Sequence, residues 1–347
     1  MDSPQTRSAS QPAPPRPPAT QQPTPQEPPA SPASASAASP APQVSPASAP
    51  AASPAPQVSP SPAPAASPSD GGKPADRPSD AERMRAEPLD PARTDAYLRR
   101  IGADRPAVPD AEALHDLHLR HLRTVPFENL SVHLAEDVAL AYEPLVDKVV
   151  GASRGGFCYE LNGAFAALLR ALGYRVELLA ARVFGPEGPG IPYDHLALRV
   201  HTADAAGGPW LADIGFGRNS QYPLRLDSRD QQPDPAGLFR IEETADGDLD
   251  VLRDGVPQYR LEQRPRALAD FVAGCWYHRT SPDSPFTRSL VCSRLTETGR
   301  VTLSGRTLVI TDADGGRDER ELSEAEVLPA YRTHFGITLD RIPELRG

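Results

Sequence analysis

The stretch RGGFCYELNGAF, residues 154–165, decides how the rest of the chain is interpreted. Its apolar residues recur at helical spacing as far as Leu172, so it predicts a helix over 159–172 with Gly173 as the C-terminal cap. Cys158 then lies at the amino end of that helix, where about half a positive charge favours a thiolate. The two glycines before it allow close backbone approach and leave room for a substrate. The pattern therefore indicates a nucleophile rather than a buried packing residue.

A cysteine nucleophile needs an imidazole that accepts its proton and a third group that orients the ring. His195 begins the strand pattern HLALRV, and Asp213 follows in LADIGFG at the end of the neighbouring predicted strand. Cross-strand neighbours can place a carboxylate beside an imidazole. Asp194 is the rival candidate, but adjacent residues of a strand point to opposite faces. The sequence therefore predicts the triad Cys158, His195 and Asp213.

The residues before the cysteine are predicted to be mainly helical, over 90–150. In DPARTDAYLRRIG, Asp90 and Pro91 suit the N-cap and first helical position, and Gly102 suits the end. The next stretch, AEALHDLHLRHLR, repeats its leucines and histidines at steps of three and four residues, which indicates a second helix over 111–123.

After Gly173 the apolar period changes to that of strands. The segments RVELLAARVF, HLALRVHT and PWLADIGF each read as a strand bounded by turn residues, and FRIEET with DLDVLRD reads as a hairpin. We therefore expect a mostly antiparallel sheet or barrel over 174–265. A short helix through ALADFVAGCWYHR, two strands and a last helix should follow; that helix starts at Ser323, is bent or shortened by Pro329, and stops at Gly336.

The N-terminal segment, residues 1–88, has a different composition. Of the 42 prolines in the chain, 24 lie in residues 1–90, and APQVSPASAPAASP at 41–54 recurs as APQVSPSPAPAASP at 55–68. So few large apolar side chains cannot offset the entropy of ordering the backbone, which predicts a disordered, polyproline-biased tail. PAPPRPP at 12–18 matches the pattern that SH3-like grooves bind, a pattern that proline-rich tails also match by chance.

Charge and cysteine content restrict the class of protein. A net charge of −10 without a basic stripe disfavours a nucleic-acid partner. We find neither an apolar signal region nor a membrane span, and three cysteines without CxxC spacing fit a reducing compartment. We therefore expect a soluble, cytoplasmic protein that does not bind membranes.

The remaining histidines and cysteines have simpler interpretations. His115, His118 and His121 share one helix at three-residue steps, but no cysteine or carboxylate pattern completes a metal site, so no metal is predicted. Cys275 and Cys292 lack an activating pattern and are expected to be packing residues. The other histidines are expected to be surface or satisfied interior groups; they are His133, His201, His278 and His334.

Taken together, the motifs resemble the arylamine N-acetyltransferases. VPFENL at 125–130, RGGFCYELN at 154–162 and ADIGFG at 212–217 occur in that family's order and approximate spacing. SPDSPF at 281–286 and HFGI at 334–337 follow in the same order. The resemblance covers about residues 90–345, and RGGFCYELN together with PFENL is its most specific part.

The resemblance implies an α+β fold with a cysteine-protease-like Cys-His-Asp core. Its three parts are a helical domain that carries the nucleophile, a central antiparallel β-barrel that carries the histidine and aspartate, and a C-terminal α/β lid. We expect boundaries at 89–173, 174–275 and 276–347, with the tail at 1–88. The implied activity is metal-free transfer of an acetyl group from acetyl-CoA to an arylamine or arylhydrazine.

The resemblance also assigns roles to individual residues. It implies that Cys158 is the nucleophile, His195 the base and Asp213 the group that orients the base. Arg154 is expected to pair with Glu128, which would link the RGG turn to the PFENL turn. The expected walls of the acceptor pocket are the aromatic residues Phe127, Phe216 and Phe286.

Two backbone segments complete the predicted site. N–H groups around Gly156 to Cys158 are placed to stabilise an oxyanion, and the turn from Gly215 to Gly217 could admit CoA close to the backbone. The Gly- and Pro-rich loop at 183–194 departs from the family pattern and could narrow or redirect access for the acceptor.

Three other functions are compatible with parts of the pattern. A macrolactam-forming amide synthase of the same family would use the same triad. A transglutaminase-like or papain-like enzyme shares the order Cys, His, Asp, but PFENL and the SPF region argue against it. A non-catalytic interaction protein recruited through its tail would have no need of the triad.

Overall fold

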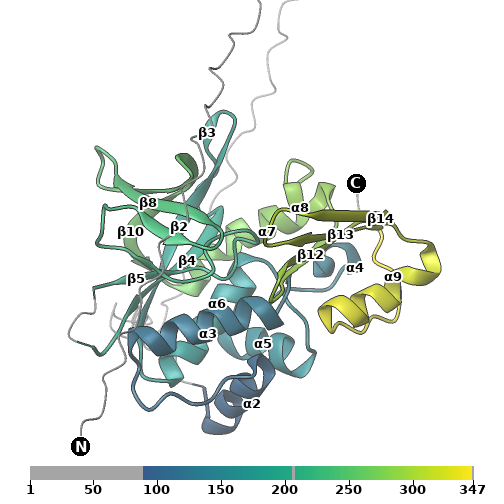
Figure 1. The fold of residues 1–347 in the computed structure, drawn as a ribbon, viewed down its shortest axis with the longest axis horizontal. Coiled ribbons are helices and arrows are strands. Elements are labelled where there is room, and N and C mark those ends of the chain that lie inside the picture. Colours follow the sequence, from purple (N-terminus) through teal and green to yellow (C-terminus); the bar gives the residue numbers. More distant parts are fainter. Residues whose placement is uncertain (1–88, 205–207, 346–347) are drawn as a thin grey trace, which may run out of the picture. The chain divides into compact units, whose positions relative to one another are not determined.

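The computed structural model of the protein describes residues 89–204 and 208–345. The predicted tail at 1–88 lies outside the described residues. Within them, a group of helices lies beside two antiparallel sheets (Figure 1). No helix of the described ranges is long and apolar enough to cross a bilayer.

The helical part begins as the capping residues predict. The Asp90 side chain accepts a hydrogen bond from the Arg93 backbone N–H at 2.9 Å, and Gly102 ends the helix with a φ of 66°. The elements are α2 (Pro91–Ile101), α3 (Ala111–Thr124), α4 (Leu130–Leu134), α5 (Tyr142–Val146), the π-helical turn η1 (Asp147–Gly151) and α6 (Cys158–Ala171).

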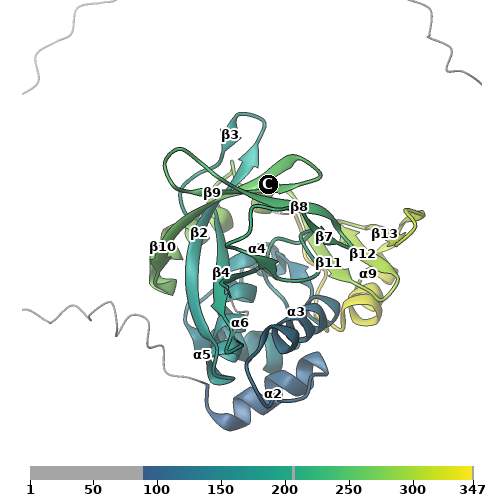
Figure 2. The same cartoon turned by 60° about the vertical axis from the view of Figure 1, so that its left-hand side comes forward.

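Helix α6 is the central element of this part. Every residue from Cys158 to Leu169 is buried, because the helix packs against its helical neighbours on one side and against strands on the other. Its main neighbours are α5 among the helices and β4 and β2 among the strands, and Figure 2 shows α6 beside β4. A polar or charged residue on this helix therefore needs a partner inside the protein.

The larger sheet, called the barrel sheet below, has the strand order β6-β5-β4-β2-β10-β9-β8-β7, and β3 pairs with β2. All its pairs are antiparallel. The strands are β2 (Arg175–Gly185), β3 (Gly188–Pro189), β4 (His195–His201), β5 (Trp210–Ala212), β6 (Leu224–Arg225), β7 (Gln232–Asp234), β8 (Gly237–Glu243), β9 (Leu249–Arg253) and β10 (Val256–Arg266).

A side chain nearly closes this sheet into a barrel. The Gln232 amide on β7 accepts a hydrogen bond from the Arg225 N–H of β6 at 2.6 Å and donates one to the Arg225 carbonyl at 2.9 Å. The edge strands β6 and β7 are thereby joined through a side chain, without backbone-to-backbone hydrogen bonds between them. Strand β2 is buried on both faces, since Leu179 packs inside the barrel and Leu178 packs toward α6.

Strand β10 was not predicted as a separate element, although it is one of the longest in the protein. Its sequence VPQYRLEQRPR contains two prolines, which usually argue against a strand interior. The register against β2 shifts between Leu261 and Pro265, so a bulge takes up the irregularity. Tyr259 and Leu261 are the fully buried residues that attach it to the barrel core.

The second sheet, called the C-terminal sheet, has the order β1-β11-β12-β13-β14. Its first strand comes from the PFENL segment, far earlier in the chain. The strands are β1 (Phe127–Glu128), β11 (Val291–Leu295), β12 (Gly299–Ser304), β13 (Thr307–Asp312) and β14 (Arg317–Glu321). The sequence predicted β12 and β13 but not β14, whose five residues RDERE are all exposed and give no apolar period.

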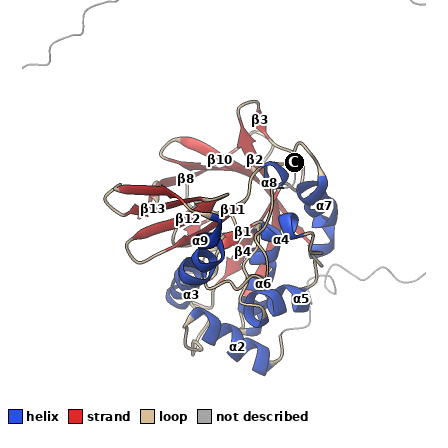
Figure 3. Ribbon diagram, turned by 90° about the vertical axis from the view of Figure 1, so that its right-hand side faces the viewer, coloured by secondary structure: helices blue, strands red, loops and turns tan. Residues whose placement is uncertain are grey.

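Short helices complete the C-terminal part. They are the 3₁₀ turn η2 (Leu268–Phe271), α7 (Val272–Thr280), α8 (Pro285–Arg288), α9 (Glu324–Ala330) and the π-helical turn η3 (Tyr331–Phe335). Figure 3 shows α9 beside the C-terminal sheet; α9 packs on this sheet through Val327, and η3 packs on it through Tyr331. Pro329 shortens the last helix as predicted, because the α-helical turns end at Ala330; η3 then continues to Phe335, and Gly336 caps it.

Candidate active site

The turn before Cys158 packs directly against the PFENL turn. A Cβ atom on Gly155 would lie 1.8 Å from the Pro126 carbonyl oxygen, so only glycine fits there. The Glu128 N–H donates to the Gly156 carbonyl at 2.9 Å, and Phe127 bridges to Gly156 in parallel. Backbone contact between two distant segments therefore sets the position of the turn that leads into α6.

The Glu160 carboxylate folds back toward the start of α6 and packs against this turn. Glu160 accepts a hydrogen bond from the Phe157 N–H at 3.2 Å, and a Cβ on Gly156 would lie 2.5 Å from the same carboxylate oxygen. The Lys148 ammonium lies 2.5 Å from the other oxygen. Glu160 is 1% exposed, so its negative charge needs compensation inside the core, and the Lys148 ammonium provides it. Neither Lys148 nor Glu160 stands out in the sequence as a site residue.

Arg154 links the same two turns. Its Nε donates to Glu128 Oε1 at 2.9 Å, and its Nη1 lies 3.1 Å from Glu136 Oε2. The second oxygen of Glu128 accepts the Leu130 N–H at 2.7 Å. Burial alone would raise the pKa of Glu128, but Lys148 and Arg154 lower it. The structure thus contains the Arg154–Glu128 pair that the resemblance implies.

The imidazole and carboxylate selected from the sequence lie in direct contact. His195, at the start of β4, places Nε2 2.8 Å from Asp213 Oδ2, just after the end of β5. His195 is 2% exposed and Asp213 is 1% exposed. Strands β4 and β5 are neighbours in the barrel sheet, so the strand pairing brings the two side chains together.

Asp213 is oriented by further donors. Oδ1 accepts the Asn162 side-chain amide at 2.9 Å and the Gly215 N–H at 3.0 Å, and Oδ2 accepts the Asn219 amide at 3.2 Å. Asn162 lies one helical turn after Cys158 on α6, so it connects the thiol-bearing helix to the carboxylate. The sequence signal was the i, i+4 spacing within RGGFCYELN, which places both residues on one face.

These contacts determine the charge of the imidazole. Burial would lower the pKa of His195, but the Asp213 carboxylate, and then a hydrogen bond with Cys158, raise it to about 10. Burial likewise opposes ionisation of Asp213, yet His195, Asn162 and Gly215 lower its pKa. At neutral pH the pair is therefore an imidazolium beside a carboxylate, and it lies next to the Cys158 sulfur.

Asp194, the rival carboxylate, has a different partner. Its Oδ1 lies 2.9 Å from His278 Nε2 of α7, and its Oδ2 accepts the Val183 N–H at 3.0 Å. His278 is 3% exposed and also contacts the Ser284 hydroxyl, so it is a satisfied interior group. Alternation along the strand explains why Asp194 and His195 face different neighbours.

Two of the three histidines of α3 have hydrogen-bond partners of their own, and the third, His115, packs edge-on against the Trp210 ring. His118 Nε2 accepts the Asp213 backbone N–H at 3.3 Å, so its Nδ1 is the donor to the Gln221 carbonyl at 2.9 Å. Burial lowers the pKa of His118 to about 4. His121 contacts the Tyr97 hydroxyl at 2.9 Å. Among the described residues we find no group of three or more metal-binding side chains that could hold an ion.

The other two cysteines lie in the packed interior. Cys275 and Cys292 are buried and free. Burial raises the pKa of Cys275 to about 12 and raises that of Cys292 strongly. Both thiols are thus protonated at neutral pH.

A cleft of about 980 Å³ opens onto the thiol. Cys158 and His195 lie in its wall, and the three phenylalanines selected from the sequence line it; they are Phe127, Phe216 and Phe286. The loop predicted to affect access also lines it, from Val183 to Ile191, and its β3 hairpin projects from the barrel sheet in Figures 1 and 2.

A second cavity of about 460 Å³, called the inner groove, joins the cleft at two rings. Phe127 and Phe216 line both spaces. Gly217, with a φ of 84°, lies at this junction, and a Cβ there would be 3.5 Å from the Phe127 ring. The remaining walls come from Arg218 and from the C-terminal sheet, including Arg300.

Known proteins of one family are similar to this chain. An N-acetyltransferase family model matches residues 110–344. The arylamine N-acetyltransferase of Mycobacterium tuberculosis is 36% identical over 257 residues, which are 72% of this chain and 90% of the relative. The Escherichia coli protein of the same name is 32% identical over 253 residues, covering 70% and 88%.

Solved structures of the same name are also similar. The M. smegmatis arylamine N-acetyltransferase superposes with a TM-score of 0.65 at 35% identity and covers 70% of this chain and 92% of its own. The Mycobacterium marinum enzyme in complex with CoA gives a TM-score of 0.65 at 32% identity, with the same coverage.

Proposed function

The chain belongs to the arylamine N-acetyltransferase family of acyltransferases, and from this premise we propose that it acetylates aromatic amines or hydrazines with acetyl-CoA through a thioester on Cys158. The observation that carries the proposal is the 2.8 Å contact between His195 Nε2 and Asp213 Oδ2 beside a buried thiol in an aromatic cleft. A scaffold protein would gain nothing from burying these three groups together.

In the first half-reaction the Cys158 thiolate attacks the carbonyl carbon of acetyl-CoA. The developing oxyanion is stabilised by backbone N–H groups at the start of α6, where the helix dipole also favours negative charge. The carbon–sulfur bond to CoA then breaks, and the His195 imidazolium gives its proton to the departing thiolate. The products are free CoA, S-acetylated Cys158 and a neutral imidazole.

In the second half-reaction the amine nitrogen attacks the acetyl carbon on Cys158. His195 accepts the proton that the amine loses, and the bond between carbon and Cys158 sulfur breaks. Acetylation has removed the negative sulfur, one of the groups that raise the pKa of His195, so the neutral ring that can accept a proton is more easily formed at this stage. The amide leaves and the thiolate–imidazolium pair is restored, which is a ping-pong cycle.

The acceptor is assigned to the cleft because of its aromatic walls. Phe127 and Phe286 lie with ring centroids 6.0 Å apart, and Phe216 lies 5.2 Å from the His195 ring. A flat aromatic amine can pack against these rings while its nitrogen points toward the thioester. The donor is assigned to the inner groove, which meets the cleft at the same rings.

The test is CoA release from purified full-length protein with acetyl-CoA and a panel of arylamines and arylhydrazines. We expect release that depends on the amine in the wild type and is lost in Cys158→Ala. Cys292→Ala, which removes a buried thiol from a different core, is the matched control and should remain active. Without amine, mass spectrometry should show one acetyl group on Cys158. Release that persists in Cys158→Ala would refute the mechanism.

The domain division and the cellular location are further parts of the proposal. We propose the domain division at residues 89–173, 174–275 and 276–347, which limited proteolysis can test. We also propose a cytoplasmic location, because three free and buried thiols suit a reducing compartment.

A further inference from the structure

The residue after the nucleophile forms a hydrogen bond with the backbone that leads to the base. Tyr159, the second residue of α6, is fully buried, and its hydroxyl donates to the Tyr193 carbonyl at 2.6 Å. The same hydroxyl lies 3.1 Å from the Asp194 carbonyl. Asp194 immediately precedes His195, so one side chain connects the position next to Cys158 with the position next to the imidazole.

Helix α6 holds the backbone on both sides of His195. On one side the contact is the Tyr159 hydroxyl, and on the other side the Asn162 side-chain amide donates to the Leu196 carbonyl at 2.6 Å. Tyr159 and Asn162 are three residues apart, which places both on one face of the helix. The thiol-bearing helix therefore fixes the carbonyls before and after the imidazole-bearing residue, and the hydrogen bond between Cys158 and His195 depends on both contacts.

Tyr193 has a backbone conformation that needs such a contact. Its φ of 60° lies in the left-handed region, which costs free energy for a residue with a Cβ and persists only where the surroundings enforce it. Its ring lies edge-on to Phe271, with centroids 5.6 Å apart, and 5.0 Å from the Arg266 guanidinium. The Tyr159 hydroxyl holds the carbonyl of the same residue. Without these contacts the backbone just before β4 would relax.

Helix α7 packs over this hydrogen bond from the other side. A Cβ atom on Gly274 would lie 2.6 Å from the Tyr193 carbonyl oxygen and 2.9 Å from the Tyr159 hydroxyl, so only glycine fits without moving them. His278 of the same helix places Nε2 3.1 Å from the Asp194 carbonyl. The hydroxyl thus lies in a packed interior, where a polar group without a partner would cost free energy.

Tyr159 does not touch the reacting atoms. It is not one of the residues that line the cleft, and the rings of Phe157 and Phe271 pack against it. Burial raises the pKa of its hydroxyl above the ordinary value, so the group stays a neutral donor at neutral pH. Its effect on the reaction must therefore pass through the backbone that it holds.

We propose that Tyr159 is a positioning residue that sets the distance between the Cys158 sulfur and the His195 imidazole. Its hydroxyl holds the start of β4 where the imidazolium lies next to the thiolate, and the attraction between opposite charges weakens as they separate. The inference rests on the proposed function, because it explains how the ion pair of that mechanism is maintained. The contact from His278 to the Asp194 carbonyl remains when Tyr159 is replaced, so loss of the hydroxyl should weaken the pair without abolishing it.

The test compares two deletions of a single buried hydroxyl group. In Tyr159→Phe the ring stays and its hydrogen bonds to the loop are lost. Tyr97→Phe is the matched control, because Tyr97 is also fully buried in the same core and its hydroxyl contacts His121 at 2.9 Å, away from the cleft. For each protein, the rate of Cys158 alkylation by iodoacetamide is followed by mass spectrometry between about pH 5 and 9. We also measure Tm, kcat, and KM for acetyl-CoA.

The titratable groups packed around Tyr159 and Cys158 are the same in the variant. They are Asp194 and His195 beside the start of β4, Cys275 and His278 on α7, and Glu160 with Lys148 behind the turn. A displaced alkylation profile therefore reports a change of position rather than a change of charged groups.

In Tyr159→Phe we expect the pH of half-maximal alkylation to rise by roughly one unit, because a more distant imidazolium stabilises the thiolate less. The kcat value should fall roughly 10- to 100-fold at nearly constant KM, since the spaces for donor and acceptor are unchanged. Tyr97→Phe should match the wild type. A purely structural role would lower Tm or the amount of active protein, but it would not move the midpoint of the alkylation profile.

Gly274→Ala approaches the same hydrogen bond from α7. The added methyl group must push the Tyr193 carbonyl away from the Tyr159 hydroxyl, so we expect the alkylation midpoint to shift in the same direction. In Tyr159→Phe/Gly274→Ala the hydrogen bond is already absent, so the shift should be smaller than the sum of the two single shifts. Gly274→Ala alone keeps the test valid if Tyr159→Phe does not fold.

Two results would overturn the inference. An alkylation midpoint in Tyr159→Phe that equals the wild-type value would show that the hydroxyl supports the fold and not the ion pair. An equal shift in Tyr97→Phe would mean that loss of any buried hydroxyl loosens the site. Failure of the proposed function gives a different pattern: the wild type would release no CoA, while the alkylation profiles of the two variants would still differ and support the role of Tyr159.

Discussion

Lys148 and Glu160 form a buried ion pair of 2.5 Å directly behind the turn that carries Cys158. The Glu160 carboxylate accepts a hydrogen bond from the Phe157 N–H. The Lys148 ammonium also donates a hydrogen bond to the Ser131 hydroxyl at 2.8 Å. The pair therefore connects η1, α4 and the first turn of α6. We assign Lys148 a positioning role, since it does not line the cleft but orients the residues next to the thiol.

Removal of Lys148 should leave a buried carboxylate without compensation. We expect Lys148→Met to lower the free energy of unfolding by about 3–5 kcal/mol and to slow alkylation of Cys158 by iodoacetamide. In Lys148→Met/Glu160→Gln the amide oxygen can still accept the Phe157 N–H without a charge, so alkylation and stability should largely recover.

Arg199→Met is the matched control for this pair, because it breaks the similarly buried Arg199–Glu177 pair at 3.0 Å in the barrel sheet. Its alkylation rate should equal that of the wild type. If Cys158 of Lys148→Met were alkylated at the wild-type rate, the positioning role assigned to Lys148 would be wrong.

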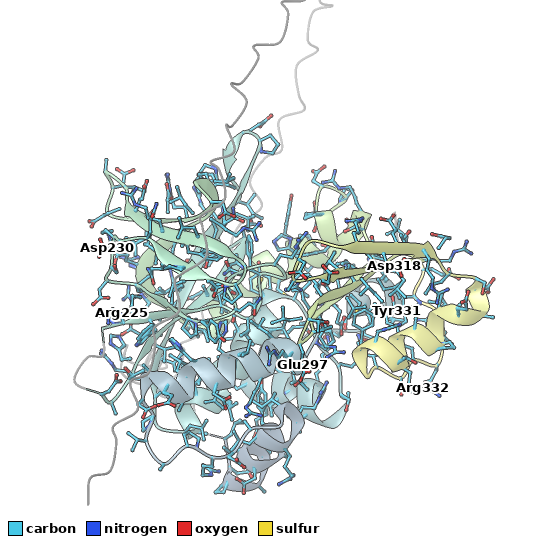
Figure 4. The ribbon with its side chains drawn as sticks, viewed as in Figure 1. Arg225, Asp230, Glu297, Asp318, Tyr331 and Arg332 are labelled. Carbon is cyan, nitrogen blue, oxygen red and sulfur yellow. The ribbon has the colours of Figure 1, made fainter. Side chains whose placement is uncertain are left out.

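Asp213→Asn should inactivate the enzyme without unfolding it. Asn162 and Gly215 both donate to Oδ1, so the new amide must place its oxygen there and turn its NH₂ toward His195 Nε2. The imidazole proton then moves to the nitrogen that faces Cys158, which is the wrong tautomer. We expect kcat to fall by roughly 10²- to 10⁴-fold while circular dichroism stays unchanged. Asp230→Asn on the exposed barrel surface, labelled in Figure 4, should be neutral.

Stability should depend on pH through His195. Its folded pKa of about 10 exceeds the ordinary value of 6.5, so the folded state binds the extra proton between these values. The stabilisation is complete below pH 6.5 and is lost as pH rises through 10, by up to about 1.4 kcal/mol per pH unit. Urea unfolding at pH 7 and 9.5 should show a smaller loss in His195→Gln than in the wild type. Identical losses would contradict the charged state assigned to the ring.

Gly155→Ala should be far more damaging than Gly151→Ala. A methyl group at 155 would meet the Pro126 carbonyl at 1.8 Å, and both partners are backbone, so the two turns must separate. We expect a loss of about 1–3 kcal/mol in unfolding free energy and a large loss of activity. Gly151 in η1 has open space within 4 Å of its Cβ position, so that variant should match the wild type. Equal Tm values for the two variants would argue against the backbone contact.

Much of the site could be predicted because it depends on local periodicity. The helical period places Cys158 at the start of α6, and the strand period both assigns His195 to a strand end and rules out Asp194. These inferences need only the neighbouring residues. Capping residues in the same way located both ends of α2 and the start of α9.

The remaining parts depend on contacts between distant segments. Lys148 and Glu160 meet because η1 and α6 pack around a turn, and nothing in the local pattern distinguishes them from surface charges. Arg218 lies in the loop after β5 and Arg300 lies on β12 of the C-terminal sheet, so their proximity follows from the packing of that loop against the sheet. Strand β14 is an exposed edge of charged residues, which carries no apolar signal for a core.

The two-residue strand β1 has a consequence for inherited changes in the coding sequence. Phe127 and Glu128 pair with Ser293 and Cys292 of β11 on one side and contact Gly156 on the other. A stop codon placed just before β11 would leave every proposed catalytic residue encoded. The nucleophile turn would nevertheless lose the strand that supports it, so such a truncated allele should behave as a null.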